Sequence, residues 1–181
     1  FYNGQVVGLE ANSSKKAVSH TETQVNIASG KTVDVARTDG TNKGGVGVFV
    51  NYGQVNNSGT IKVEKDSKAN SGAVGVYAVN GSEVINNGSI IVGGKESLGL
   101  LGVAYRTDSK GKVIIDEFGS KAAGQGQVNI VNKGSISLDG QGATAMFAKN
   151  NKAGTTYTNA TALNDTTGVI TTTGTKSVGM A

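Results

Sequence analysis

The sequence predicts an all-β protein: a parallel β-solenoid of about five coils, with three short strands in each coil and inserted loops. Short phrases recur along the chain at related spacings, and each phrase alternates apolar with small or polar residues. The alternative is an antiparallel β-sandwich, which also contains many short strands. A sandwich does not predict near-identical phrases 29 residues apart, so we favour the solenoid.

The composition agrees with a chain made mostly of strands and tight turns. Glycine accounts for 28 of the 181 residues, twice the usual ~7%, and proline, cysteine and tryptophan are absent. A chain without proline keeps its backbone N–H groups available for strand pairing, because proline cannot donate to a ladder. Without cysteine, the chain has neither a disulfide bond nor a thiolate metal site.

The clearest repeat is a phrase that opens on glycine. The opening glycines, spaced by 29, 29, 46 and 34 residues, are Gly30, Gly59, Gly88, Gly134 and Gly168. In "GTIKV" (59–63), Ile61 and Val63 point to one side of an extended chain and the residues between them to the other. This two-residue period predicts one strand in every repeat.

Two further phrases accompany each opening glycine and supply two more strands. The phrase that follows it reads "GVGVFV" (45–50), "AVGVYAV" (73–79), "SLGLLGV" (97–103), "ATAMFAK" (143–149) and "SVGMA" (177–181), with "VVGLEA" (6–11) as an earlier copy. The phrase that precedes it reads "QVNNS", "EVINN" and "QVNIVNK". Coils of this kind stack about 4.8 Å apart, which predicts a rod roughly 25–30 Å long.

The interior of such a rod is expected to hold aliphatic ladders of Val, Ile and Leu. Asparagine at a corner adopts the left-handed conformation more readily than most residues and bonds its own backbone. A column of stacked asparagines, such as Asn56/Asn57, Asn86/Asn87 and Asn132, is expected to bond from coil to coil. The stretch 9–26 is polar on all sides, and we interpret it as a loop.

The period breaks after Gly88, where the repeat carries about 17 extra residues near 106–127. Insertions in a solenoid form surface loops, often on the binding side, so this segment is either a recognition loop or hairpin or a neutral insertion. We favour the neutral insertion. The residues it offers for binding a partner are Arg106, Asp108, Lys110, Lys112, Asp116, Glu117 and Phe118. A second expansion, 149–165, is polar and is interpreted as a passive surface loop.

The residues needed for catalysis or for a cofactor are missing or scattered. His20 is the single histidine, and the 13 carboxylates are spread along the chain. Asp116 and Glu117 are adjacent, but neighbours on a strand face opposite ways. We therefore expect no enzyme activity, no cofactor and no metal. The net charge of +4 is not clustered, so nucleic-acid binding is not expected.

One motif resembles a nucleotide-binding loop. Gly140, Gly142 and Ala145 match the G-x-G-x-x-[GA] pattern just after a predicted strand. A dinucleotide site would require a helix to open at this point, whereas "ATAMFAK" aligns with the second phrase of the other repeats. We therefore expect a strand here and no nucleotide.

No apolar run is long enough to span a membrane. The chain begins at Phe1 rather than Met and ends in mid-pattern, so we interpret residues 1–181 as a single solenoid segment from a longer protein.

Three stretches carry a family resemblance: "VNNSGTIKV" (55–63), "INNGSIIVGGKESLGLLG" (85–102) and "GVITTTGTKSVGMA" (168–181). They resemble the passenger repeats of large autotransporter adhesins (type V secretion) of Gram-negative bacteria, and the resemblance covers about residues 25–181. It implies a right-handed β-helix displayed outside the cell and anchored through the outer membrane by a C-terminal β-barrel of the parent chain. No catalytic residue carries over.

The function that the resemblance implies is attachment to host cells or to other bacteria, through a surface protein or glycan. Two alternatives remain: a purely structural stalk with binding elsewhere in the parent, and a polysaccharide-active β-helix protein. The absence of cysteine suits a chain that crosses an oxidising periplasm unfolded, where disulfides would trap it.

Overall fold

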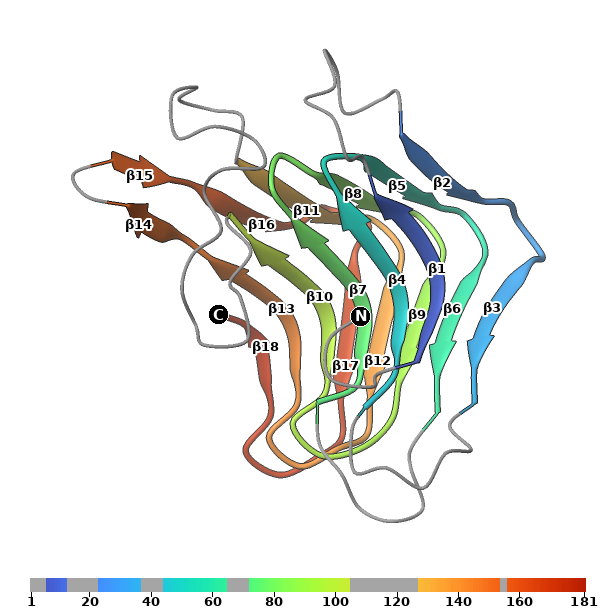
Figure 1. The fold of residues 1–181 in the computed structure, drawn as a ribbon. Helices are drawn as coiled ribbons and strands as arrows, with labels where there is room; N and C mark the ends of the chain where they lie inside the picture. Colours follow the sequence, from blue (N-terminus) through green and yellow to red (C-terminus); the bar gives the residue numbers. More distant parts are fainter. Residues whose placement is uncertain (1–5, 13–22, 37–43, 65–71, 105–126, 154–155) are drawn as a thin grey trace.

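The computed structural model describes residues 6–12, 23–36, 44–64, 72–104, 127–153 and 156–181, with the backbone alone for 151–153 and 156–158. The chain folds as a right-handed parallel β-helix with three strands per coil, as the repeats predict (Figure 1). The described residues contain no helix, and therefore none that could cross a membrane.

Three parallel sheets enclose the core, and each takes one strand from each coil. The strands of the first sheet are β1 (Val7–Asn12), β4 (Val46–Asn51), β7 (Val74–Val79), β10 (Leu98–Val103), β13 (Thr144–Lys149) and β18 (Val178–Met180). In Figure 1 they lie side by side in this order, with colours passing from blue to red along the stack.

The second and third sheets have five strands each, which agrees with the expected number of coils. The second sheet contains β2 (Gln24–Ile27), β5 (Gln54–Asn57), β8 (Glu83–Asn86), β11 (Val128–Asn132) and β16 (Ala160–Asn164). The third contains β3 (Thr32–Val35), β6 (Thr60–Val63), β9 (Ser89–Val92), β12 (Ser135–Leu138) and β17 (Val169–Thr172).

Strands pair in register, so each position of a coil meets the same position of the next coil. In the third sheet the register joins Val33 to Ile61, Ile61 to Ile90, Ile90 to Ile136 and Ile136 to Ile170. The three middle members of this column are buried. The predicted aliphatic ladders are thus confirmed, and they form the continuous core of the rod.

The third residue of the "GVGVFV" phrase belongs to a column of glycines. A Cβ on Gly47, Gly75 or Gly99 would lie 2.4–2.6 Å from the Cγ2 atom of an isoleucine of the third sheet, in each case also against a carbonyl oxygen of the next coil. These positions face the core where two sheets come close together. In β13 the same position holds Ala145, so the column accepts at most a methyl group.

The predicted asparagine column is present inside the corner that follows the second sheet. The Nδ2 atom of each residue donates to the Oδ1 atom of the next: Asn57 to Asn86 at 2.7 Å, Asn86 to Asn132 at 2.7 Å, and Asn132 to Asn164 at 2.8 Å. The first three are fully buried. Each amide therefore satisfies its neighbour where water has no access.

The prediction for the residues next to this column was only partly right. Asn87 is exposed and does not join the column. Asn56 points outward and donates to Asn26 Oδ1 at 2.9 Å on the surface of the second sheet.

A second amide column lies at the end of the first sheet, and its bonds run in the opposite direction. Asn51 Nδ2 donates to Asn12 Oδ1 at 2.8 Å, and Asn80 Nδ2 donates to Asn51 Oδ1 at 2.9 Å. Asn80 has a φ of 49°, so here a corner asparagine does take the left-handed conformation. The two columns therefore fix the same stack of coils at two different corners.

The loop expected over 9–26 is wrong at both of its ends. Leu9 to Asn12 belong to β1, and Gln24 to Asn26 belong to β2. The polar residues of these strands face outward, and their backbones pair with β4 and β5. Polar side chains are therefore compatible with a strand here. The strand forms because its backbone pairs with the next coil, and its outward side chains can be polar.

The loop expected over 149–165 is also wrong in part. The chain forms a short antiparallel hairpin, β14 (Asn151–Ala153) with β15 (Thr156–Thr158), which projects from the stack in Figure 1. Residues 160–164 then form β16 and pair with β11. The inward positions of β16 are Ala160 and Ala162, which are too small to stand out as an apolar strand in the sequence.

We expect Gly75→Val to destabilise the rod, because the new side chain would overlap Ile90 and the backbone oxygen of Gly99. Overpacking of this kind lowers the free energy of unfolding by about 1–3 kcal/mol or more. The control is Gly30→Asn, since a Cβ on Gly30 meets nothing within 4 Å and asparagine tolerates its φ of 75°. Urea titration measures both. Equal midpoints for the two variants would contradict the close approach of the sheets.

We expect Asn86→Ala to lower the free energy of unfolding by about 1–3 kcal/mol, because it removes the amide that donates to the buried Asn132 Oδ1 and leaves Asn57 Nδ2 with only its longer bond to the Ser89 carbonyl oxygen. Asn87→Ala is the matched control, with an expected change below about 0.5 kcal/mol, since Asn87 is exposed. Thermal or urea unfolding of the two variants measures the difference. Similar losses in both would mean that the column does not stabilise the coils.

Candidate functional site

The insertion residues proposed to bind a partner lie in a segment outside the described residues. These residues are Arg106, Asp108, Lys110, Lys112, Asp116, Glu117 and Phe118, and His20 also lies outside the described residues.

The described part of the chain contains no group of three or more His, Cys, Asp or Glu side chains arranged to hold a metal ion. The glycine motif at 140–145 leads into β13, whose Thr144 pairs with Leu98 of β10. A strand therefore stands where a dinucleotide fingerprint requires a helix. This confirms the strand expected here: Gly140 and Gly142 lie at the corner before β13, and Ala145 lies within β13.

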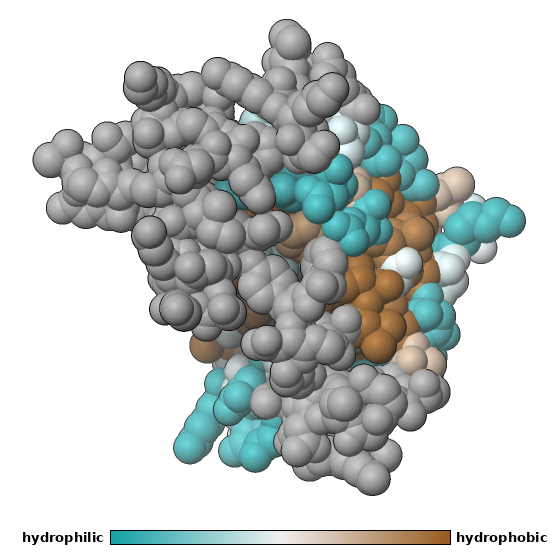
Figure 2. All heavy atoms as spheres, viewed as in Figure 1, coloured by the Kyte–Doolittle hydropathy of each residue, from teal (hydrophilic) through white to brown (hydrophobic). Residues whose placement is uncertain are grey.

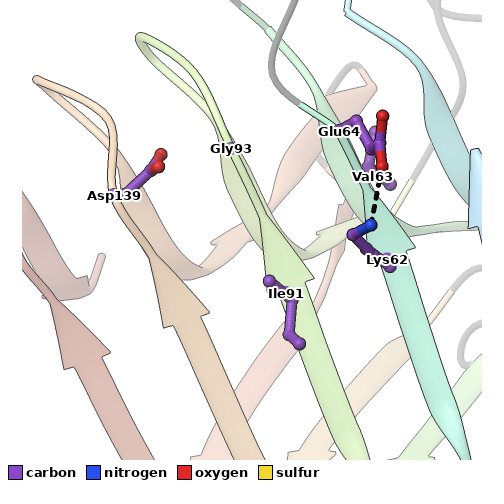
Figure 3. Close-up of a pocket in the computed structure, with 6 residues that line it drawn as sticks. All are labelled: Lys62, Val63, Glu64, Ile91, Gly93 and Asp139. Atoms are coloured by element: carbon purple, nitrogen blue, oxygen red, sulfur yellow. Dashed lines mark hydrogen bonds and ion pairs between the residues drawn. The ribbon is translucent and has the colours of Figure 1, made fainter. Parts of the chain in front are cut away.

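A charged groove crosses three coils on the outside of the third sheet (Figure 3). Its volume is about 330 Å³, and its lining residues are Lys62, Val63, Glu64, Ile91, Gly93 and Asp139. Lys62 and Ile91 are register partners on β6 and β9. Ile91 is 43% exposed and provides an apolar surface between the charged groups.

The register explains how these residues meet. Glu64, Gly93 and Asp139 each stand five residues after the opening glycine of their repeat, and Lys62 and Ile91 each stand three after it. Sequence reasoning did not identify the groove, although counting from the opening glycine would have placed its members side by side.

The charges within the groove are partly paired. Lys62 Nζ lies 2.6 Å from Glu64 Oε1 and 3.6 Å from Asp34 Oδ2. The hydrogen bond to Glu64, followed by the charge of Asp34, raises the pKa of Lys62 above its ordinary value of 10.5. At neutral pH this lysine is therefore a cation and a hydrogen-bond donor, and it cannot act as a general base.

Asp139 borders the next coil of the groove. Its Oδ1 atom accepts a hydrogen bond from the Gly94 N–H at 3.1 Å. With Lys62 donating, Glu64 and Asp139 accepting and Ile91 exposed between them, the groove is suited to binding polar ligands that also have an apolar face, such as sugars or peptides.

The outside of the first sheet is different, because most outward side chains of β4, β7 and β10 are apolar. A second apolar cluster contains Val46, Phe49, Val74, Val79 and Val103, with Val7, Tyr77, Leu98 and Leu101 packed against it. The rings of Phe49 and Tyr77 meet edge to face, with centroids 5.6 Å apart. In Figure 2, apolar atoms are visible near the positions of β1 and β4.

Comparison with protein families, with curated proteins and with solved structures gives no match.

We expect Glu64→Gln to lower the pKa of Lys62 toward 10.5, because it removes the carboxylate that accepts the shortest hydrogen bond. Asp34→Asn should lower it less, since that contact is longer. Because the folded-state pKa is raised, stabilisation from these contacts is present below pH 10.5 and is lost as pH rises through the folded-state value. NMR titration of the Lys62 side chain measures the pKa. An unchanged titration in Glu64→Gln would contradict the pairing.

Proposed function

We propose that this chain is a non-catalytic segment of a bacterial surface adhesin, similar to the passenger repeats of autotransporters. It would contribute a rigid shaft and a lateral surface for attachment to host cells or to other bacteria. In this proposal the segment is extracellular, and a part of the parent chain outside these residues anchors it to the outer membrane.

The observation that carries the proposal is the unbroken in-register stack of coils. Its interior is filled by aliphatic ladders and by amide columns whose members bond one another. Such a stack is lengthened by adding further coils, and each coil contacts only its neighbours. This construction yields length and stiffness, which are the properties that a surface-displayed shaft needs.

The groove of the third sheet supports attachment over the purely structural stalk. Lys62 and Glu64 of one coil and Asp139, two coils further along, present charged groups on either side of the exposed Ile91. A stalk has no need of such a groove, whereas a lateral binding surface does. The ligand class that fits is a glycan or a peptide with both polar and apolar parts.

The test is adhesion of beads coated with the folded chain to epithelial cells and to bacteria, compared with beads coated with heat-unfolded chain. We expect the folded chain to bind and the free chain to compete. Folded beads that adhere no better than unfolded ones would contradict attachment by this segment and favour the stalk. Release of sugars from acidic polysaccharides would support the polysaccharide-active alternative.

We further expect the double variant Lys62→Met/Asp139→Asn to reduce adhesion by about tenfold, equivalent to about 1.4 kcal/mol of binding free energy. The matched control is Lys133→Met/Asp165→Asn, which removes another surface lysine and aspartate, 3.7 Å apart at a corner outside the groove. Asp165 also accepts a backbone hydrogen bond, as Asp139 does. Equal adhesion by both double variants would exclude the groove as the binding surface.

A further inference from the structure

The charged groove lies in the middle of the third sheet, and this position limits what can bind there. Its lining residues belong to β6, to β9 and to the turns that follow β6, β9 and β12. Each of these three strands is hydrogen-bonded to another strand on both sides. A peptide that binds by adding a strand needs an unpaired sheet edge. The groove therefore cannot hold a peptide in this way, and its side chains must recognise the ligand.

The side chains of the groove offer both a donor and acceptors. Lys62 has three N–H donors and contacts two carboxylates, those of Glu64 and Asp34, so one donor remains for a ligand. Glu64 Oε1 accepts the bond from Lys62, and Asp139 Oδ1 accepts the N–H of Gly94. Within the described part of the chain, the second oxygen of each of these two carboxylates accepts no hydrogen bond. A ligand hydroxyl suits this set, because it both donates and accepts.

The floor of the groove adds an apolar contact. Ile91 lies between the charged groups and is 43% exposed. A sugar has hydroxyl groups around its rim and an apolar C–H face, so one ring can bond the charged groups and cover Ile91 together. The groove volume of about 330 Å³ is within the range of small-molecule sites. These features favour a sugar over a ligand that only donates hydrogen bonds, such as an ammonium group.

The place of each residue in the repeat sets the direction of the ligand. Glu64, Gly93 and Asp139 follow one another in successive coils, so the backbones of the two acidic residues are about 10 Å apart. Gly93 lies between them and has no side chain (Figure 3). Hydroxyl groups at opposite ends of a sugar ring can therefore reach both carboxylates across Gly93. Further rings of the same chain would continue along the rod axis.

The described residues give this groove an excess of negative charge. Glu64, Asp139 and Asp34 are three carboxylates, and Lys62 is the ammonium group that pairs with two of them. The adjoining corner at 95–96 ("KE") carries one charge of each sign and does not alter the balance. A carboxylate on the ligand would be repelled, and repulsion of this kind selects one ligand against another.

We propose that the groove of the third sheet binds a neutral oligosaccharide and rejects acidic ones. One sugar ring lies over Gly93 with its C–H face against Ile91. Its hydroxyl groups bond Lys62, Glu64 and Asp139, and the oligosaccharide runs along the rod across the strands. This inference rests on the proposed attachment function and deepens it, because it names the class of glycan on the attached surface.

The test is NMR titration of the isotope-labelled folded chain with matched pairs of tetrasaccharides. The neutral probes are cellotetraose, mannotetraose and galactotetraose, and each is paired with the tetrasaccharide of the corresponding uronic acid. We expect at least one neutral probe to shift the amide signals of Ile91 and Gly93. Its acidic counterpart, which differs only in the carboxylates, should bind at least about tenfold more weakly.

Two variants locate the sugar and test the charge effect. Gly93 has no positive φ, so Gly93→Phe can be accommodated by the backbone, and its ring would occupy the place of the sugar. We expect at least about a tenfold loss of affinity, and no loss in the control Asn87→Phe at an exposed corner outside the groove. Asp139→Asn should reduce the preference for the neutral probe severalfold, a ratio that a purely structural role would not change.

Four results would overturn the proposal. The first is that no neutral probe binds, and the second is that neutral and acidic probes bind equally. The third is an equal loss in Gly93→Phe and Asn87→Phe. The fourth is that the peptide (Lys-Val)5, and no tetrasaccharide, shifts the signals of Ile91 and Gly93.

Bead adhesion separates this inference from the function on which it rests. If folded beads adhere and no neutral tetrasaccharide competes, attachment stands and the neutral-glycan site is wrong. If a neutral tetrasaccharide binds the groove but folded beads adhere no better than unfolded ones, the site stands and attachment is wrong.

Discussion

Parallel pairing between successive coils is the interaction on which the rest of this structure depends. Each strand of the three sheets finds its backbone partners in the neighbouring coils. Because the pairing is in register, a side chain meets its equivalents above and below it, at about the 4.8 Å spacing of hydrogen-bonded strands. Each inward side chain must therefore fit against the equivalent side chains of the coils above and below it.

This constraint determines which residues the interior accepts. Isoleucine and valine stack on their own kind, as Ile61, Ile90 and Ile136 do. A buried amide is acceptable when the next coil offers another amide, because Asn57 and Asn86 then satisfy each other. The same stacking explains the glycines, since at Gly75 the third sheet and the next coil leave no room for a Cβ.

The register also determines the surfaces. Residues far apart in sequence, such as Glu64 and Asp139, come into one groove because they share a place in the repeat. On the first sheet the same rule aligns Phe49, Tyr77 and Leu101 into one apolar strip. A solenoid can thus build a charged surface on one side and an apolar face on another without altering its core.

The sequence predicted the features that repeat and missed those that do not. The coil, its three strands and the column through Asn57, Asn86 and Asn132 followed from phrases with a fixed offset. The end strands β1 and β2 were partly misread, because their identity comes from backbone partners in the next coil and not from their own polar side chains. Strand β16 was missed because its inward positions are small alanines.

The candidate surfaces were harder to predict than the fold. The groove was overlooked because its charges are scattered along the chain and converge only once the register is known. The burial of Phe49 could not be inferred from the sequence, since alternation shows that a residue faces outward and not how exposed it is.

The most direct test of the account is a nuclear Overhauser map of the backbone of the isotope-labelled chain. In-register parallel coils predict contacts between Ile61 and Ile90, 29 residues apart, and between Ile90 and Ile136, 46 residues apart, in a parallel-strand pattern. Close Hα–Hα contacts between paired strands of the three sheets, which antiparallel pairing produces, would contradict the coil architecture and the surfaces that depend on it.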